Sequence, residues 1–253
     1  MFISHKYKFI FLRVPKTAST SLSEFFVRNI DDPDAFYTDV DDANLDGTVP
    51  HGKLKEIRGV HEHYKPFSHL HLNLKELVDY GIVTPEQINE YYCFAVLRDP
   101  IERQKSFYYF FKKWEDERSG KKPYDIDDYK FMAPNGWFDG DKATGEDNSK
   151  LLQSDFLMYD GKQQGEYWLY ENLLVHIQSF MDDIGVPINH KLKKHKSNFR
   201  VDKIDESKSF NFDHQAITTM RHYYKNDFNL YSLLKRQYHA DTTSLHTYNR
   251  QTN

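Results

Sequence analysis

Two continuous apolar runs stand out along the chain, and each leads into a polar turn. The first covers residues 9–14 and is interrupted only by Arg13, and the second covers residues 91–97. Unbroken apolar runs of this length are typical of strands that a parallel sheet buries on both faces. The two runs therefore predict two central strands of one parallel sheet in an α/β fold.

Helix-start signals follow both strands. After the first strand, Ser21 and Glu24 have the spacing of a capping box, which predicts a helix over residues 22–30. After the second strand, Asp99 is a favourable N-cap and Pro100 a favourable first helical residue. Each strand is thus expected to enter a helix through a short turn.

Further helices are indicated by capping signals and by apolar spacing. Asn73 and Glu76 form a second capping box, which predicts a helix over residues 74–80. Residues 167–184 place apolar side chains three or four positions apart and predict an amphipathic helix that Gly185 ends. Alternating strand and helix signals favour a sheet flanked by helices.

The length of 253 residues suits a single domain over residues 1–253. Residues 119–150 are polar and lack periodicity, which is typical of a long loop or lid. Residues 240–253 are polar and are expected to form a flexible tail.

Charge and composition exclude several classes of protein. A formal net charge of −4 argues against general nucleic-acid binding, although 34 Lys and Arg leave room for a local anion site. The apolar runs are too short for a membrane span, and a strand at residue 9 leaves no room for a signal peptide. The single cysteine, Cys93, fits a reducing compartment. We expect a cytoplasmic protein, and the sequence does not indicate its oligomeric state.

The turn after the first strand has the composition of an anion-binding loop. Lys16 is followed by five small residues and then by the predicted helix. Backbone amides and the positive end of the helix dipole would meet at this turn. The loop lacks both glycines of the GxxxxGK[ST] motif, so it does not predict hydrolysis of a magnesium nucleotide. A lysine on an ordinary strand-to-helix turn is the alternative interpretation.

This turn, RVPKTASTSL, resembles the 5′-phosphosulfate loop of the sulfotransferases that use 3′-phosphoadenosine 5′-phosphosulfate (PAPS), particularly the uronyl 2-O-sulfotransferases of heparan sulfate. The resemblance implies that Lys16 contacts the bridging oxygen of the phosphosulfate. It also implies that the backbone amides of the next residues hold the phosphate: Thr17, Ala18, Ser19, Thr20 and Ser21. A P-loop-NTPase-like three-layer fold and a metal-free reaction follow from the same resemblance.

A second motif, LRDPIERQKSF, begins at the end of the second strand. In the same sulfotransferases an arginine here and a serine eight residues later bind the 3′-phosphate, and Arg98 and Ser106 have that spacing. A guanidinium can hold phosphate oxygens with two bonds, to which a hydroxyl adds a donor. Arg103 is ambiguous, because it could brace Asp99 or Glu102 or line the acceptor site.

Paired histidines precede the helix that begins near residue 74. His69 and His71 resemble the His-Gly-His-Val-Ser motif of the uronyl 2-O-sulfotransferases, although Leu70 replaces the glycine. We predict that His71 is the catalytic base and that His69 supports it, with Glu62 as the alternative base. The positive end of the nearby helix would keep His71 neutral. A zinc site lacks a convincing third ligand, and hydrogen-bonded histidines at a helix start are a purely structural alternative.

Two later segments also resemble the sulfotransferases. A basic stretch lies where their loop covers the adenosine and the 3′-phosphate, so Lys194, Lys196 and Ser197 are candidate donor-binding residues. A solvated face or a nucleic-acid patch would explain the same charges. Residues 223–231 match a family pattern of tyrosines around Asp227 and Phe228, which we interpret as packing.

The sequence therefore predicts an enzyme that moves a sulfuryl group from PAPS to an acceptor hydroxyl, preferably on a carbohydrate. The expected product of the donor is adenosine 3′,5′-bisphosphate. Two alternatives are a P-loop-like nucleotide kinase or NTPase and a catalytically inactive glycan-binding module on the same fold. The loop at residues 119–150 is expected on the acceptor side, but neither the acceptor nor the position that is modified can be read from these motifs.

Overall fold

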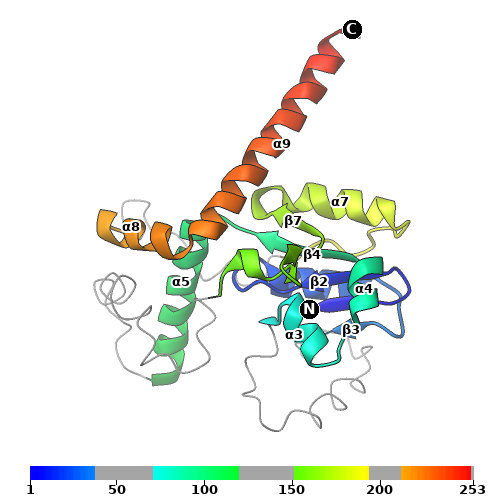
Figure 1. The fold of residues 1–253 in the computed structure, drawn as a ribbon, viewed down its shortest axis with the longest axis horizontal. Helices are drawn as coiled ribbons and strands as arrows, with labels where there is room; N and C mark the ends of the chain where they lie inside the picture. Colours follow the sequence, from blue (N-terminus) through cyan, green and yellow to red (C-terminus); the bar gives the residue numbers. More distant parts are fainter. Residues whose placement is uncertain (38–70, 120–150, 194–211, 252–253) are drawn as a thin grey trace.

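A five-stranded sheet forms the centre of the computed structural model, which describes residues 1–37, 71–119, 151–193 and 212–251 (Figure 1). The spatial order is β3-β1-β2-β4-β7. The bounds are β1 Phe2–Ser4, β2 Phe9–Leu12, β3 Phe36–Tyr37, β4 Tyr92–Leu97 and β7 Glu166–Leu169, and a separate hairpin pairs β5 Met158–Tyr159 with β6 Lys162–Gln163.

The strands β2, β4 and β7 are parallel neighbours, and β1 is antiparallel to both β2 and β3. Leu12, the last residue of β2, lies opposite Ala95 in β4. Both predicted central strands are therefore confirmed as adjacent and parallel. Their carboxyl ends, and the two turns that follow them, lie at one edge of the sheet.

Helices cover both faces of this mixed sheet. One face packs a cluster of aromatic side chains against α1 and α7, and the other packs aliphatic side chains against α3 and α4. The helical bounds are α1 Ser19–Asn29, α3 Leu74–Asp79, α4 Pro85–Glu90, α5 Pro100–Ser119, α7 Leu173–Asp183, α8 His214–Tyr223 and α9 Lys225–Gln251, with the 3-10 turns η3 Gln153–Asp155 and η4 Tyr170–Asn172. The α/β class with a mostly parallel central sheet is confirmed.

The prediction of a helix over residues 167–184 is partly wrong. Its first residues form the strand β7, and α7 begins only at Leu173. Tyr167 and Leu169 enter the cluster on one face of the sheet, while Trp168 enters the cluster on the other. This alternation is the two-residue period of a strand, which pairing with β4 imposes over the helical spacing.

The predicted start of α1 is also wrong. The helix begins at Ser19 after Ala18, whose side chain makes no capping bond, so Ser21 lies inside the first turn. Glu24 does not complete a capping box; it forms an ion pair with Arg28 at 2.7 Å. The loop turns earlier than predicted because Lys16 and Ala18 both have positive φ, of 65° and 64°.

Other capping predictions are confirmed. The Asn73 side chain accepts from the amide of Glu76, whose side chain accepts from the amide of Asn73. Asp99 Oδ1 accepts from the amides of Ile101 and Glu102 at 2.9 and 3.0 Å. These caps fix the residues at which α3 and α5 begin.

The final helix, α9, lies against the body at its beginning and then extends away from it (Figure 1). The sequence predicted a flexible tail from residue 240, but α9 is helical as far as Gln251; flexibility itself stays a prediction. Of the loop expected at residues 119–150, Ser119 is the last residue of α5, and residues 120–150 lie outside the described residues. Among the described helices, none combines the length and hydropathy that crossing a membrane requires.

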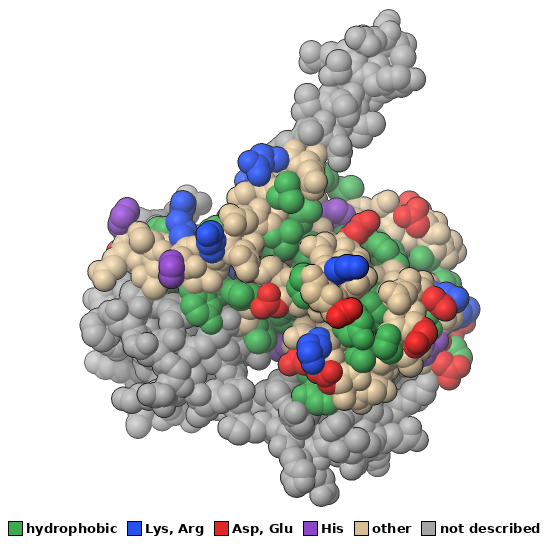
Figure 2. Space-filling model, in the orientation of Figure 1, with side chains coloured by type: hydrophobic (Ala, Val, Ile, Leu, Met, Phe, Trp, Pro, Cys, Tyr) green, Lys and Arg blue, Asp and Glu red, His purple; other side chains and the backbone are tan. Residues whose placement is uncertain are grey.

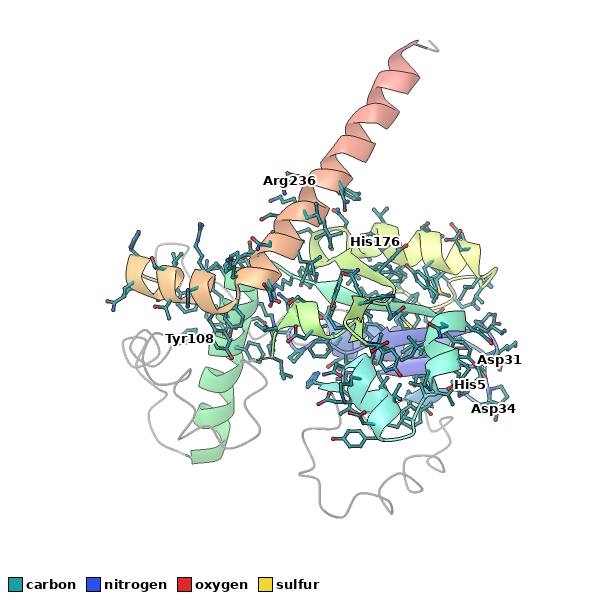
Figure 3. The ribbon with its side chains drawn as sticks, in the orientation of Figure 1. His5, Asp31, Asp34, Tyr108, His176 and Arg236 are labelled. Carbon is teal, nitrogen blue, oxygen red and sulfur yellow. The ribbon has the colours of Figure 1, made fainter. Side chains whose placement is uncertain are left out.

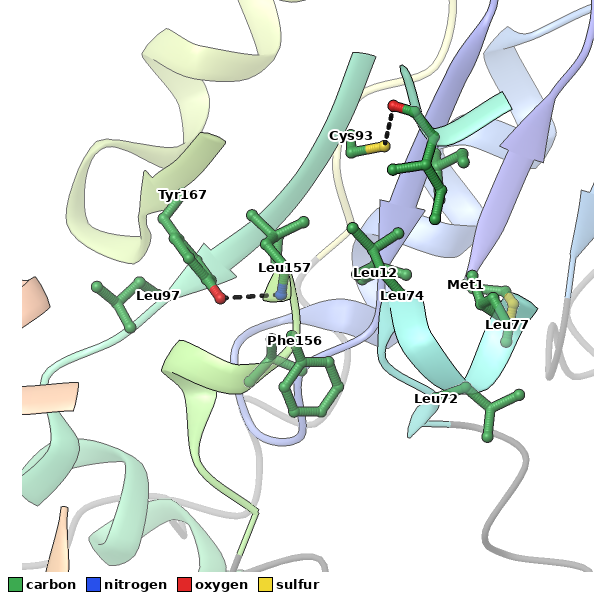
Figure 4. Packing of buried hydrophobic residues seen from close by; sticks show 14 of the residues in the cluster. Met1, Leu12, Leu72, Leu74, Leu77, Cys93, Leu97, Phe156, Leu157 and Tyr167 are labelled. Carbon is green, nitrogen blue, oxygen red and sulfur yellow. Dashed lines mark hydrogen bonds between the residues drawn. The ribbon is translucent and has the colours of Figure 1, made fainter. Parts of the chain in front are cut away.

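Cys93 lies in the cluster that packs against α3, α4 and residues 156–157 (Figure 4). Tyr167 is in the same cluster, where its hydroxyl donates to the carbonyl of Gln153 and accepts from the amide of Leu157. Burial raises the pKa of the Cys93 thiol to about 12. The cysteine is therefore a core residue, as its position in an apolar run predicted.

Candidate functional site

The turn after β2 brings an uncapped helix start next to a lysine. Lys16 and Ala18 adopt the left-handed conformation, and Thr17 Oγ1 donates to the carbonyl of Val14 at 2.9 Å, which closes the turn. The first backbone amides of a helix point toward its N-terminus, so those of α1 are directed toward this turn, where Ala18 offers no side-chain cap. This is the geometry expected of an anion site at a helix N-terminus.

The turn after β4 contacts the turn after β2 directly. Arg98 Nη1 donates to the carbonyl of Lys16 at 3.1 Å, and Arg103 Nε donates to the carbonyl of Pro15 at 3.1 Å. Arg103 Nη1 also donates to the carbonyl of Leu151 at 2.8 Å. Two arginines from the second motif therefore hold the backbone of the first motif, 82 and 88 residues away.

Arg103 consequently has a role that neither sequence interpretation included. It is 1% exposed, and its hydrogen bonds above connect the Lys16 turn to residue 151. The ring of Phe107 lies 5.2 Å from the Arg103 guanidinium carbon and 5.9 Å from Lys16 Nζ. Ser106 precedes this ring and is three residues from Arg103, so it lies near the α5 face that meets the turn.

His71 is placed against the same strand end. Its Nδ1 lies 2.6 Å from the carbonyl oxygen of Arg13. Because a carbonyl only accepts, Nδ1 carries the proton and Nε2 is the basic atom of the neutral ring. Burial, followed by the charges of Arg13 and Arg103, lowers the pKa of His71 to about 3. The neutral imidazole that the sequence predicted is thus explained by burial and by these arginines; the influence of the helix start stays a prediction.

Positive charge at this edge of the sheet comes from inside the protein. Arg13, Arg98 and Arg103 are only 2%, 8% and 1% exposed. On the face drawn in Figure 2, by contrast, Asp and Glu side chains are scattered over the body with Lys and Arg among them. A buried cation polarises its surroundings more strongly than an exposed one, so the edge suits an anionic ligand despite the negative net charge.

Three residues with contacts to the site were not singled out from the sequence as site residues. Arg13 Nη2 donates to Thr20 Oγ1 at 3.1 Å, the Arg98 guanidinium lies 4.5 Å from the Tyr170 ring, and Gln153 bonds the main chain of Arg98. A signal existed only for Arg13, because a charged residue inside an apolar run must find polar partners.

A model of the sulfotransferase family matches residues 1–233. This chain belongs to the sulfotransferase family. The match includes β2, β4, His71 and both turns, so the residues assembled above lie within the part that defines the family. No curated protein and no solved structure matches the chain. Members of this family are sulfotransferases, so the general reaction of this chain is the transfer of a sulfuryl group.

Several predicted site residues of the sulfotransferase lie outside the described residues: His69, Glu62, Lys194, Lys196 and Ser197. Their roles stay predictions. Within the described part of the chain, no three His, Cys, Asp or Glu side chains are grouped as a metal site.

A hollow of about 350 Å³ lies elsewhere in the sulfotransferase. It is lined by Tyr92 and Glu166, the first residues of β4 and β7, and by side chains of α7 such as His176. The amino ends of parallel strands are opposite the carboxyl ends, where Lys16 and Arg98 follow. This hollow is therefore not part of the candidate site.

Proposed function

We propose that this sulfotransferase transfers a sulfuryl group from PAPS to an acceptor hydroxyl, preferably on a carbohydrate, and releases adenosine 3′,5′-bisphosphate. The observation that supports this most directly is the 3.1 Å hydrogen bond from Arg98 to the carbonyl of Lys16. This bond joins the two motifs that resemble the PAPS-binding site of sulfotransferases, at one edge of the sheet. A donor with phosphates at both ends of an adenosine needs two such anion sites. We also propose the single-domain, P-loop-like architecture that the family resemblance implies.

The 5′ end of the donor would bind at the turn after β2. The uncapped start of α1 offers backbone amides to phosphate oxygens, and residues 17–21 are small enough for close approach. We assign Lys16 to the bridging oxygen, where negative charge develops as the sulfur–oxygen bond breaks. Such preorganised donors stabilise the transition state without a metal ion.

The 3′ end of the donor would bind Arg98 and Ser106. The guanidinium of Arg98 lies against the Tyr170 ring, which restricts its orientation. Lys194, Lys196 and Ser197 remain proposed contacts to the adenosine and the 3′-phosphate. Binding energy from this remote end would position the sulfur for in-line attack.

His71 is the proposed base, with His69 in support. Nε2 would accept the proton of the acceptor hydroxyl while its oxygen bonds to sulfur, and the electron pair of the broken sulfur–oxygen bond would remain on the departing phosphate. The hydrogen bond from Nδ1 to the Arg13 carbonyl fixes the required tautomer. Because its pKa is lowered, the ring is neutral at physiological pH, which leaves the lone pair on Nε2 with which to accept this proton.

Titration calorimetry with adenosine 3′,5′-bisphosphate and with AMP tests the donor assignment. We expect the bisphosphate to bind the wild type at least about tenfold more tightly, because only it offers a 3′-phosphate to Arg98. Equal affinities, or binding of ATP that requires magnesium, would contradict the proposal and favour a kinase or NTPase. Transfer of label from PAPS to a panel of glycans then tests catalysis, since an inactive glycan-binding module would transfer none.

A further inference from the structure

The first turn of α9 makes buried polar contacts that the proposed function does not explain. Asp227 lies in the first turn of α9 and is 0% exposed. Its two carboxylate oxygens accept from the amides of Gln153 and Ser154 at 2.9 and 2.8 Å. The carboxylate therefore fixes the start of η3, which lies 73 to 74 residues earlier in the chain.

The side chain that Asp227 holds in place in turn holds Arg98. Gln153 Oε1 accepts from the amide of Arg98 at 3.0 Å, and Gln153 Nε2 donates to the carbonyl of Arg98 at 2.9 Å. The main-chain amide and carbonyl of Arg98 are thus both bonded to the side chain of Gln153. Gln153 is itself fully buried, so water does not compete for these bonds.

A second connection runs from α9 to the guanidinium side of Arg98. The Tyr231 hydroxyl donates to Glu171 Oε1 at 3.0 Å, one turn after Asp227 on the same helix. Glu171 follows Tyr170 in η4, and the Tyr170 ring lies 4.5 Å from the Arg98 guanidinium carbon. Asp227 is therefore connected to the main chain of Arg98 through Gln153. Tyr231 is connected to the Arg98 guanidinium through η4.

We propose that Asp227 is a positioning residue for the donor site, which acts through Gln153 to orient Arg98, and that Tyr231 assists through η4. This inference rests on the proposed function, because it takes Arg98 to bind the 3′-phosphate. Asp227 touches no substrate in this scheme. Its effect should therefore appear as a loss of selectivity for a 3′-phosphorylated nucleotide and not as a general loss of nucleotide binding.

The test is Asp227→Asn in the full chain, with calorimetric titration of adenosine 3′,5′-bisphosphate and of AMP. An asparagine keeps one acceptor oxygen but directs an NH₂ group toward a second backbone amide, which misplaces η3. We expect the ratio of the two affinities to fall about tenfold, since hydrogen bonds to charged groups are worth roughly that factor or more. The affinity for AMP should fall less than that for the bisphosphate, because AMP has no 3′-phosphate and depends on Arg98 only through its bond to the Lys16 carbonyl.

A matched control is Asp32→Asn. The Asp32 carboxylate also accepts backbone amides, from Lys6 at 3.1 Å and Asp34 at 3.0 Å. Its neighbours Asp31 and Asp34 lie at the right edge of the body in Figure 3, well apart from Arg236 of α9. This variant should lose stability without any change in the affinity ratio.

Tyr231→Phe is the milder second variant, for use if Asp227→Asn does not fold. It removes only the hydroxyl that bonds Glu171, and we expect the affinity ratio to fall about threefold. An unchanged ratio in a folded Asp227→Asn protein, or in Tyr231→Phe when the first variant does not fold, would overturn the positioning role. If the wild type itself does not prefer the bisphosphate, the proposed function is wrong, and the inference falls with it.

Discussion

Arg103 Nε lies 3.1 Å from the carbonyl oxygen of Pro15, although 88 residues separate them in the chain. With the bond from Arg98 to the Lys16 carbonyl, this contact makes the turn after β2 dependent on the helix that follows β4. The two sequence motifs are thus one structural unit, in which two arginines of the second motif bond the backbone of the first.

We predict that Arg103→Lys loosens this unit. A lysine cannot supply the fork that reaches both the Pro15 and Leu151 carbonyls, so at least one of these two carbonyls loses its donor. The expected loss is about 1–3 kcal/mol in the free energy of unfolding and about tenfold in affinity for adenosine 3′,5′-bisphosphate. Thermal unfolding and calorimetry measure both. Arg236→Lys, at an exposed position of α9, should change neither appreciably; equal effects in the two variants would contradict the bracing role.

His71→Ala should lower turnover by about 100-fold or more, because the acceptor hydroxyl loses its base. Affinity for adenosine 3′,5′-bisphosphate should stay within about twofold of the wild type, since the ring is not a proposed donor contact. Steady-state transfer assays and calorimetry give the two quantities. His222→Ala, on an exposed position of α8, is the control. Turnover close to that of the wild type would transfer the role of base to another group, such as Glu62.

The lowered pKa of His71 predicts how stability changes with pH. The unfolded chain takes up a proton near pH 6.5, whereas the folded ring does so only near pH 3, so the unfolded state binds more protons between these values. Stability should therefore fall as the pH is lowered through this range, by up to about 1.4 kcal/mol per pH unit from this residue.

Urea unfolding of His71→Asn at several pH values isolates this contribution. Asparagine can still donate to the Arg13 carbonyl but does not titrate, so the variant should lose less stability between pH 6.5 and pH 3 than the wild type. His190→Asn, on an exposed side chain, should follow the wild type. Parallel curves for His71→Asn and the wild type would show that the ring is not held neutral.

Gly165→Ala tests the pairing of β4 with β7. A methyl group at residue 165 would lie 1.8 Å from the carbonyl oxygen of Cys93, and the backbone there has φ of +87°. We expect a loss of more than about 3 kcal/mol in the free energy of unfolding. Gly185→Ala, also at positive φ but in open space, should lose only about 1 kcal/mol. Similar losses in urea unfolding would mean that the two strands do not approach this closely.

The two central strands could be predicted because each is apolar on both faces, a pattern that depends on local sequence alone. Residues 167–169 could not, because Trp168 and Leu169 fit the apolar spacing of the helix that follows them; only pairing with β4 decides in favour of a strand. The start of α1 was missed for a related reason. Ser21 and Glu24 satisfy a capping pattern, but positive φ at Lys16 and Ala18 ends the loop sooner.

The same distinction applies to the candidate site. Lys16, His71 and Arg98 could be named because they belong to short motifs, whereas Gln153 contacts Arg98 across 55 residues, and no short motif indicates that contact. Asp227 was recognised only as part of a packing motif. Its contacts with η3 depend on where α9 meets the sheet, which no local spacing reveals.

The burial of Cys93 has a practical consequence for experiments on α9. The chain has one cysteine, and with a pKa of about 12 its thiol is almost entirely protonated at neutral pH, the form that reacts slowly with maleimides. A cysteine introduced at an exposed position of α9, such as Lys235, could therefore be labelled selectively with a fluorophore or spin probe in the otherwise native protein. Spectroscopy with such a probe would report directly on whether nucleotide binding moves the helix that bears Asp227.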